Sequence, residues 1–189
     1  MPAEHAHQRK LLHTRRIVCT GYERENGLYE IEGHLQDISA DATELLYRDL
    51  EAGGVIHDMR LNLTFDAQLL IHDAHAHIDA SPTPFCADIQ QRYEQLVGQR
   101  MVPGFTHTVK RLFGATNGCT HLSELLGPIA TTAYQTLFAV QRENHGRRKP
   151  LPDTPWLLPK PATVGSCHAL RAEGPVAEIL WPLERRLNK

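Results

Sequence analysis

The stretch VIHDMRLNLTFDAQLLIHDAHAHID, residues 55–79, decides the fold. Its first half has the alternating pattern of a β-strand with one buried face. Asp66 and Ala67 break the alternation as a turn would, and the second half reads as a returning strand. The stretch therefore predicts a β-hairpin. The residues of its first strand that carry the apolar face are Leu61, Leu63 and Phe65.

Another hairpin is predicted upstream, at residues 13–38. The strand RRIVCTGYE runs into an Asn26-Gly27 turn, and LYEIEGHLQDI leaves that turn. The polar segment SADATELLYRDLEAGG, residues 39–54, joins the two hairpins, and we expect this connector to be helical. Two hairpins in succession favour an antiparallel sheet.

Three helices are predicted after the second hairpin. The first starts near Pro84, has Cys86 in its first turn and ends at Gly98, and a shorter helix ends at Gly114. The third has the strongest helical pattern of the chain, GCTHLSELLGPIATTAYQTLFAV at residues 118–140. Its apolar stripe consists of Leu122, Leu125, Leu126, Ile129, Ala133, Leu137 and Val140.

The third helix also carries the signals that set its boundaries. Thr120 is the expected N-cap, which leaves Cys119 at the N-terminal boundary. Pro128 lies inside the pattern and lacks an amide hydrogen, so we expect it to kink the helix or split it after Gly127.

The C-terminal quarter is expected to leave the core and return to it. Prolines stiffen an extended arm, and the last segment resembles a hairpin with Gly174 and Pro175 near its turn. The predicted fold class is α+β, an antiparallel sheet of two N-terminal hairpins packed against three helices, with a Pro-rich arm and a C-terminal hairpin. The expected parts are a flexible N-terminus (1–12), an α+β core domain (13–143), a basic and Pro-rich arm (144–163) and a C-terminal hairpin packing on the core (164–189).

The composition predicts a soluble globular protein. Hydrophobic residues make up 41% and charged residues 22% of the 189 residues, close to the averages for globular domains. No apolar run approaches the roughly 20 residues that a membrane helix needs. The polar start MPAEHAHQRK does not resemble a secretory signal. We therefore expect a cytoplasmic protein without a membrane partner.

The charge argues against nucleic acid as a partner. Twenty basic and 22 acidic residues leave a net charge of -2, so no overall positive field attracts a polyanion. A local basic cluster is expected to be a solvated part of the arm. The expected partner is a small-molecule substrate, and the sequence is compatible with a homo-oligomer. The basic cluster consists of Arg142, Arg147, Arg148 and Lys149.

Four cysteines, Cys19, Cys86, Cys119 and Cys167, are far apart and include no CxxC pair. This spacing argues against a thioredoxin-type pair and against a secreted disulfide scaffold, so we expect thiols or metal ligands. Cys19 lies inside an apolar strand and is expected to be an inert core residue. Cys167 and His168 follow the long Pro-rich arm, and they could join a site in the core only if the arm returns them to it.

Two of these cysteines lie at predicted helix N-termini, which is the most informative feature. The unpaired amides and the helix dipole stabilise a thiolate there, and a thiolate is both a nucleophile and a metal ligand. His121 follows Cys119 by two residues, so the pair could chelate one ion or supply a thiol with a base. His57, from the strand VIHDMRL, is a further candidate. The expected metal ligands are His57, Cys86, Cys119 and His121.

Other polar residues near the hairpins have competing interpretations. His75 and His77 lie on one strand face together with Asp73, as in some zinc sites. We expect a solvated polar face instead, because the leucines of the same hairpin already supply a core face. Asp37 and Asp58 lie beside candidate ligands and could orient a histidine by a hydrogen bond.

The motifs VIHDMRLNL, SPTPFC and NGCTHLSELLGPIATTA resemble those of a bacterial family described as a domain of unknown function. The resemblance extends from about Arg15 to Trp181. It indicates membership but implies no particular activity.

The order of elements is also similar to the iron–sulfur scaffold fold of the NifU and IscU proteins. Those proteins have a strand hairpin, a cysteine that opens a helix ending near a glycine, and a last cysteine that opens a long helix. Cys86 with Gly98 and then Cys119 follow that order here. The resemblance places His57 at the aspartate ligand of the scaffold and Val55 at its first cysteine. The missing cysteine argues against cluster assembly, since a cluster needs all its thiolates.

The set that is left, His57, Cys86 and Cys119, has room for a fourth ligand, which could be His121, Cys167 or an exchangeable water. The leading hypothesis is a small metalloenzyme, a lyase or hydrolase in which zinc or ferrous iron acts on a small carbonyl or acyl substrate. A non-enzymatic metal or iron–sulfur carrier, or a metal-free thiol enzyme with Cys119 as nucleophile, are the alternatives. The expected catalytic residues are His121, Cys119 and Asp58.

Overall fold

The computed structural model describes residues 8–145, 160–161 and 163–186. The chain divides into two compact units, residues 1–144 and 145–189, and each is described by itself. Most of the predicted Pro-rich arm and three of the four residues of the basic cluster lie outside the described residues, as does the start of the predicted flexible N-terminus.

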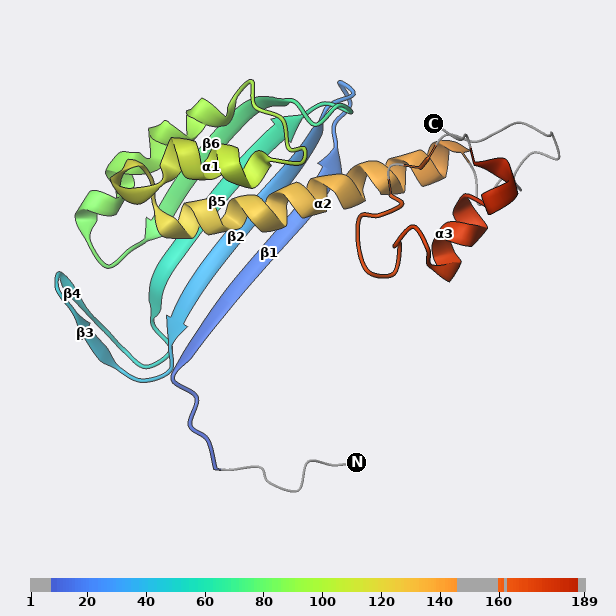
Figure 1. Ribbon diagram of the computed structural model, residues 1–189. Helices are drawn as coiled ribbons and strands as arrows, with labels where there is room; N and C mark the ends of the chain where they lie inside the picture. The colour runs from blue at the N-terminus through green and yellow to red at the C-terminus, as the bar shows by residue number, and fades with distance from the viewer. Residues whose placement is uncertain (1–7, 146–159, 162, 187–189) are drawn as a thin grey trace. The chain divides into compact units, whose positions relative to one another are not determined.

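The first unit contains a four-stranded antiparallel sheet (Figure 1). Both predicted hairpins are confirmed in this sheet. The Asn26-Gly27 turn joins the first pair, and Gly27 adopts the left-handed φ of 78° that this turn requires. Strand order is β1-β2-β5-β6. The strands are β1 (His13–Glu23), β2 (Tyr29–Ser39), β5 (Val55–Phe65) and β6 (Ile71–Ala80).

The connector between the hairpins is a small two-stranded sheet, so the predicted helix at residues 39–54 is wrong. β3 (Thr43–Leu45) pairs antiparallel with β4 (Arg48–Leu50). Leu50 is the one apolar residue of these two strands that is buried. Leu46, which would share a helix face with Leu50, is 85% exposed, so the connector buries no helical apolar face.

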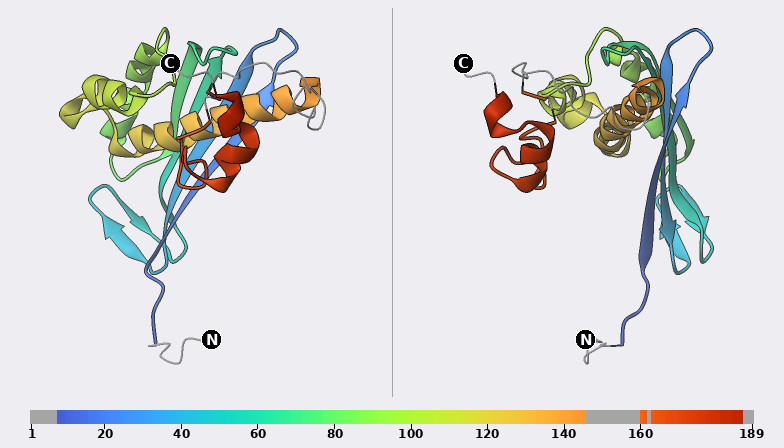
Figure 2. Two further views of the ribbon diagram at one scale, coloured as in Figure 1. Left: turned by 45° about the vertical axis from the view of Figure 1, so that its right-hand side comes forward. Right: turned by 90° about the vertical axis from the view of Figure 1, so that its right-hand side faces the viewer.

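Helices cover one face of the sheet, as the edge-on right-hand view of Figure 2 shows. Alternate residues of β2 and β5 point into this layer and form the core with the helices. Gly33 on β2 lets a helix approach closely, because a Cβ there would lie 2.6 Å from Ile129 Cδ1. The covering elements are η1 (Pro84–Leu96), α1 (Phe105–Phe113), η2 (Ala115–Asn117) and α2 (Thr120–His145).

The first of the three predicted helices is confirmed in position but is a 3-10 helix, η1. Its buried side chains are Tyr93 and Leu96, three residues apart, which suits the three residues per turn of this helix type. Val97, which follows the helix as its C-cap, is 45% exposed.

The long helix α2 is continuous through Pro128, so the predicted split is wrong. Its N-cap is Cys119 and not Thr120, because the Ser123 amide donates to the Cys119 carbonyl at 3.0 Å. The buried Tyr93 hydroxyl accepts a hydrogen bond from the Cys119 amide at 3.0 Å and lies 2.9 Å from Ser123 Oγ. Tyr93 therefore ties the start of α2 to η1.

The second unit contains α3 (Pro175–Leu180) and η3 (Leu183–Arg185). The predicted C-terminal hairpin is wrong, since the described residues of this unit include no strand. Pro175 opens the helix at a first-turn position, where its fixed φ is already helical and its missing amide hydrogen costs nothing. Among the described residues of both units, no helix has the length and apolar character to cross a membrane.

Tyr93→Phe should lower the free energy of unfolding by about 1–3 kcal/mol, because it leaves the Cys119 amide without its buried acceptor. Urea denaturation measures the change. Tyr134→Phe is the matched control, because the Tyr134 side chain is largely exposed, and it should shift the value by less than about 0.5 kcal/mol. Equal effects of the two substitutions would contradict the capping role.

Candidate functional site

One cross-strand row of the sheet collects the polar residues of the site. Arg15 on β1 pairs with Asp37 on β2, and Asp37 pairs with His57 on β5. All three side chains point to the helix-covered face, in phase with the buried Leu35 and Met59. A row of this kind places neighbouring side chains about 5 Å apart.

Asp37 is the centre of the row and is only 1% exposed. Arg15 donates to both of its oxygens, from Nε to Oδ1 and from Nη2 to Oδ2, each at 2.7 Å. His13 Nε2 lies 2.9 Å from Oδ1. The hydrogen bonds from Arg15 hold the pKa of Asp37 far below its usual value, against the opposing effect of burial. The carboxylate is therefore ionised although it is buried.

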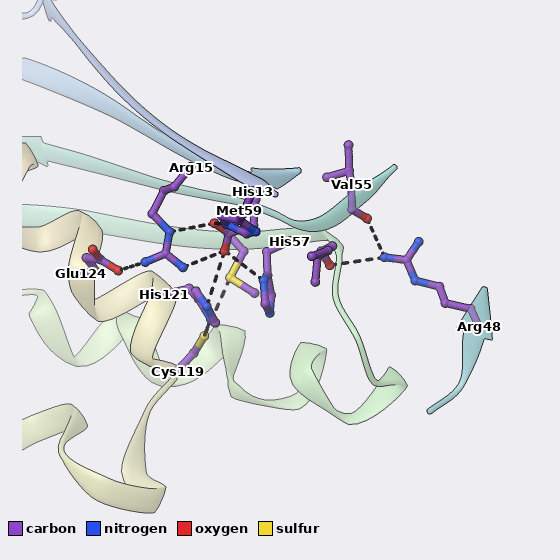
Figure 3. A network of polar contacts seen from close by, with 11 residues as sticks. His13, Arg15, Arg48, Val55, His57, Met59, Cys119, His121 and Glu124 are labelled. Carbon is purple, nitrogen blue, oxygen red and sulfur yellow. Dashed lines mark hydrogen bonds and ion pairs between the residues drawn. The ribbon is translucent and has the colours of Figure 1, made fainter. Parts of the chain in front are cut away.

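Two histidines face the Oδ2 atom of this carboxylate (Figure 3). His57 Nδ1 lies 3.0 Å away and His121 Nε2 lies 3.6 Å away. Their rings are close together, with centroids 3.8 Å apart and planes 31° from parallel. Burial is the main cause that lowers the pKa of each histidine, helped by the charge of His121 at His57 and of Arg15 at His121. Both rings are therefore neutral near pH 7.

Cys119 completes the cluster from the N-terminus of α2. Its Sγ lies 3.9 Å from His121 Nδ1 and 3.8 Å from Met59 Sδ. The bond between the Cys119 amide and the Tyr93 hydroxyl fixes its backbone. The thiol thus lies at the N-terminus of α2, beside the His121 imidazole.

The cluster has the geometry of a metal site. Asp37, His57 and His121 each offer a ligand atom, and these atoms lie within 4.8 Å of one another. The hydrogen bond to Asp37 assigns the Nδ1 proton of His57, which leaves the lone pair on Nε2 free. His121 turns Nε2 toward Asp37 Oδ2 at 3.6 Å, which is longer than a hydrogen bond, and turns Nδ1 toward Cys119 Sγ at 3.9 Å.

Of the four predicted metal ligands, His57 and His121 belong to this group, and Cys119 adjoins it through its 3.9 Å contact with His121 Nδ1. This brings three of the four predicted residues to one place. The fourth, Cys86, lies in the first turn of η1, as expected, and its Sγ is 3.3 Å from Thr83 Oγ1. Within the described part of the chain, the group of three ligand atoms within 4.8 Å includes neither Cys86 nor Cys119, but Cys119 contacts a member of the group, His121.

The predicted catalytic Asp58 lies on the opposite face of the sheet, because it is the strand neighbour of His57. There it accepts from Gln36 Nε2 at 2.7 Å and lies 2.6 Å from His34 Nε2. Asp37, which the sequence suggested only as an orienting group, has the role of partner to both histidines.

The remaining candidates lie away from the cluster or take no part in it. His75 and His77 are exposed, as predicted, and pair with neighbouring aspartates. Cys19 packs against the core, also as predicted, and burial raises its pKa. Cys167 is exposed in the second unit.

Two members of the site, Arg15 and Met59, were not among the predicted residues. Arg15 could have been found from the sequence. Paired residues of the first hairpin are equally far from Asn26 along the chain, and this rule pairs Arg15 with Asp37. Met59 follows His57 by two residues and so shares its face. Its contact with Cys119 could be recognised only once the position of α2 was known.

Comparison with protein families matches residues 13–135 to the family described as protein of unknown function, DUF2889. This confirms the expected membership of a family of unknown function over those residues; the expected extent to Trp181 and the bacterial origin are still predictions. No curated protein and no solved structure matches the chain, so the likeness to the NifU and IscU scaffold fold is still a prediction.

Asp37→Asn should lower the free energy of unfolding at pH 7 by about 3 kcal/mol, because it leaves Arg15 without its buried partner. The native pKa of Asp37 is depressed, so its stabilisation is complete above the unfolded pKa and is lost as the pH falls through the native value. The difference between wild type and variant should therefore shrink below about pH 4. Urea denaturation across this pH range measures it.

The control is Asp41→Asn, which removes an exposed ion pair with Lys10 and should cost less than about 1 kcal/mol. A loss at Asp37 no larger than this, or one independent of pH, would contradict the assigned role.

Proposed function

Because the chain belongs to the family of proteins of unknown function DUF2889, its activity has to be argued from its own site, and we propose that it is a small metalloenzyme. The single observation that supports this is the convergence of His57, His121 and Asp37 within 4.8 Å. They come from three separate elements, β5, α2 and β2.

The proposed ligands are His57 Nε2, His121 Nδ1 and Cys119 Sγ. Two imidazoles and a thiolate form a donor set that suits zinc or ferrous iron. The lowered pKa values keep both histidines neutral, and only the neutral ring offers a lone pair to an ion.

Asp37 is proposed to orient these ligands and not to bind the ion itself. Oδ1 accepts from Arg15 Nε and lies 2.9 Å from His13 Nε2, and Oδ2 accepts from Arg15 Nη2 and lies 3.0 Å from His57 Nδ1. These partners together use the lone pairs that a metal would need. A carboxylate that accepts the second N–H of a ligating histidine fixes the tautomer and the ring orientation, and it raises the basicity of the ligand. Asp37 can serve His57 and His121 together in this way.

Three protein ligands leave one position of a tetrahedral ion for water or substrate, as in catalytic zinc sites. The histidine side chains are 14% and 22% exposed, so a small molecule can reach the ring edges. An ion there would polarise a carbonyl or activate water, which is the chemistry of a metal-dependent lyase or hydrolase on a small carbonyl or acyl substrate. We place this chemistry in the cytoplasm, where Cys119 stays reduced.

A second function has its own support in the order of atoms through His121. Cys119 Sγ faces Nδ1 of His121 at 3.9 Å, and the opposite nitrogen Nε2 faces Asp37 Oδ2 at 3.6 Å. Nucleophile, base and orienting carboxylate follow one another as in thiol hydrolases. In this alternative the protein works without metal and Cys119 forms the covalent intermediate.

Metal binding tests the first function. Untagged wild-type protein should bind one equivalent of zinc, and His57→Gln or Cys119→Ser should lower the affinity at least tenfold, which mass spectrometry of the metal content and a zinc competition titration measure. Cys86→Ser should retain wild-type affinity if the ligands are those proposed.

The matched control for the histidines is the double variant His75→Gln/His77→Gln, which changes the same residue type on the exposed face of the same sheet. It should bind zinc like wild type. Loss of the metal in this control but not in His57→Gln would contradict the proposed site, and a brown protein containing iron and sulfide would favour a cluster carrier.

Alkylation kinetics test the second function. In a Cys167→Ser background, which removes the exposed thiol, metal-free protein should react with iodoacetamide first at Cys119. His121→Ala should slow this reaction about tenfold or more by removing the base. Peptide mass spectrometry measures the site and the rate, and a Cys119 rate unaffected by His121→Ala would rule out the thiol–imidazole pair.

A further inference from the structure

Met59 brings a second sulfur to the cluster. It follows His57 by two residues on β5, points to the same face and is 1% exposed. Its Sδ lies 3.8 Å from Cys119 Sγ, and Figure 3 shows both sulfurs beside the two histidine rings.

The two distances from Cys119 Sγ to its neighbours in this group suit a single ion. Two donors bound at about 2.3 Å in a tetrahedron lie about 3.8 Å apart. The contacts of Cys119 Sγ with Met59 Sδ and with His121 Nδ1, at 3.8 and 3.9 Å, are close to this spacing. Thiolate, thioether and the His121 imidazole are thus spaced like donors to one ion, and the His57 ring lies against the His121 ring with centroids 3.8 Å apart.

The donor types distinguish among metals. A thioether is a soft ligand that selects monovalent copper, and copper exceeds zinc in the affinity order of divalent metals for sites of this kind. A cysteine, two histidines and a methionine are the donor set of copper electron-transfer proteins. Zinc gains little from the methionine and takes water in its place.

We propose that this cluster binds one Cu(I) ion through Cys119, Met59 and the imidazoles of His57 and His121. The inference rests on the proposed function, because it uses the same histidines and thiol, and it adds Met59 as a ligand that selects the metal. The burial of the thioether supports it, since the Met59 side chain is 1% exposed and its sulfur is available to an ion without competition from water on that side.

The alternative is that the Cys119 thiol merely donates a weak hydrogen bond to the Met59 sulfur within the core. Met59→Leu separates the two, because leucine keeps the volume of the side chain and removes only the sulfur. Met101→Leu is the matched control, since Met101 is another methionine of the same core, 3% exposed.

The experiment titrates reduced, metal-free full-length protein with Cu(I) against bicinchoninate and, in parallel, with zinc against a chromophoric zinc chelator. Wild type should bind one equivalent of Cu(I). Met59→Leu should weaken Cu(I) binding at least tenfold and leave zinc binding within about threefold, and X-ray absorption of the copper-loaded variant should show one sulfur neighbour fewer. Met101→Leu should match wild type in every measurement.

Equal Cu(I) affinity of wild type and Met59→Leu, or zinc binding by wild type without Cu(I) binding, would overturn the copper inference and leave the proposed metal centre standing. Failure of wild type to bind either metal would overturn both. Cooperative thermal unfolding of each variant establishes that a lost affinity is not a lost fold.

Discussion

Two parallel hydrogen bonds from Arg15 to Asp37 are the constraint on which the site depends. An ionised carboxylate with 1% exposure would cost several kcal/mol without them. With them, the remaining capacity of the carboxylate turns toward His57 and His121. Arg15 also pairs with Glu124 on α2, so one guanidinium connects the edge strand, the neighbouring strand and the helix that carries Cys119. The interaction that compensates the charge of Asp37 therefore also positions the carboxylate against His57 and His121.

The alternation of the strands explains how a polar cluster can lie at the edge of an apolar core. On β5, successive residues of one face run from His57 through Met59 to the buried leucines. The helix layer covers this face to bury its apolar residues, and the polar residues at the end of the row are buried with them. Neutral histidines and a thioether tolerate that burial, and the one charged group is the one that has an arginine partner.

Much of the fold and part of the site could be predicted from the sequence. The Asn26-Gly27 turn and the alternation around Leu63 place both hairpins correctly, because turn chemistry and period are local signals. The connector and the C-terminal segment were mispredicted, because their structure depends on what their apolar residues can pack against. Cys119 and His121 were found from their position at a helix start. The part played by Asp37 depends on cross-strand register and on the placement of α2, and neither is local.

The connector between β2 and β5, which contains the hairpin β3–β4, begins beyond the bulge at Asp37 and Ile38. The geometry of the site therefore does not depend on how long the connector is. Asp37 and His57 are held as direct partners in the sheet, and the intervening chain leaves and returns beyond them. Residues 40–54 can therefore gain or lose length without moving either ligand-bearing strand, since the entropy of closing a loop changes slowly with its length. Proteins built on this sheet are therefore free to vary the connector without changing the pairing of Asp37 with His57.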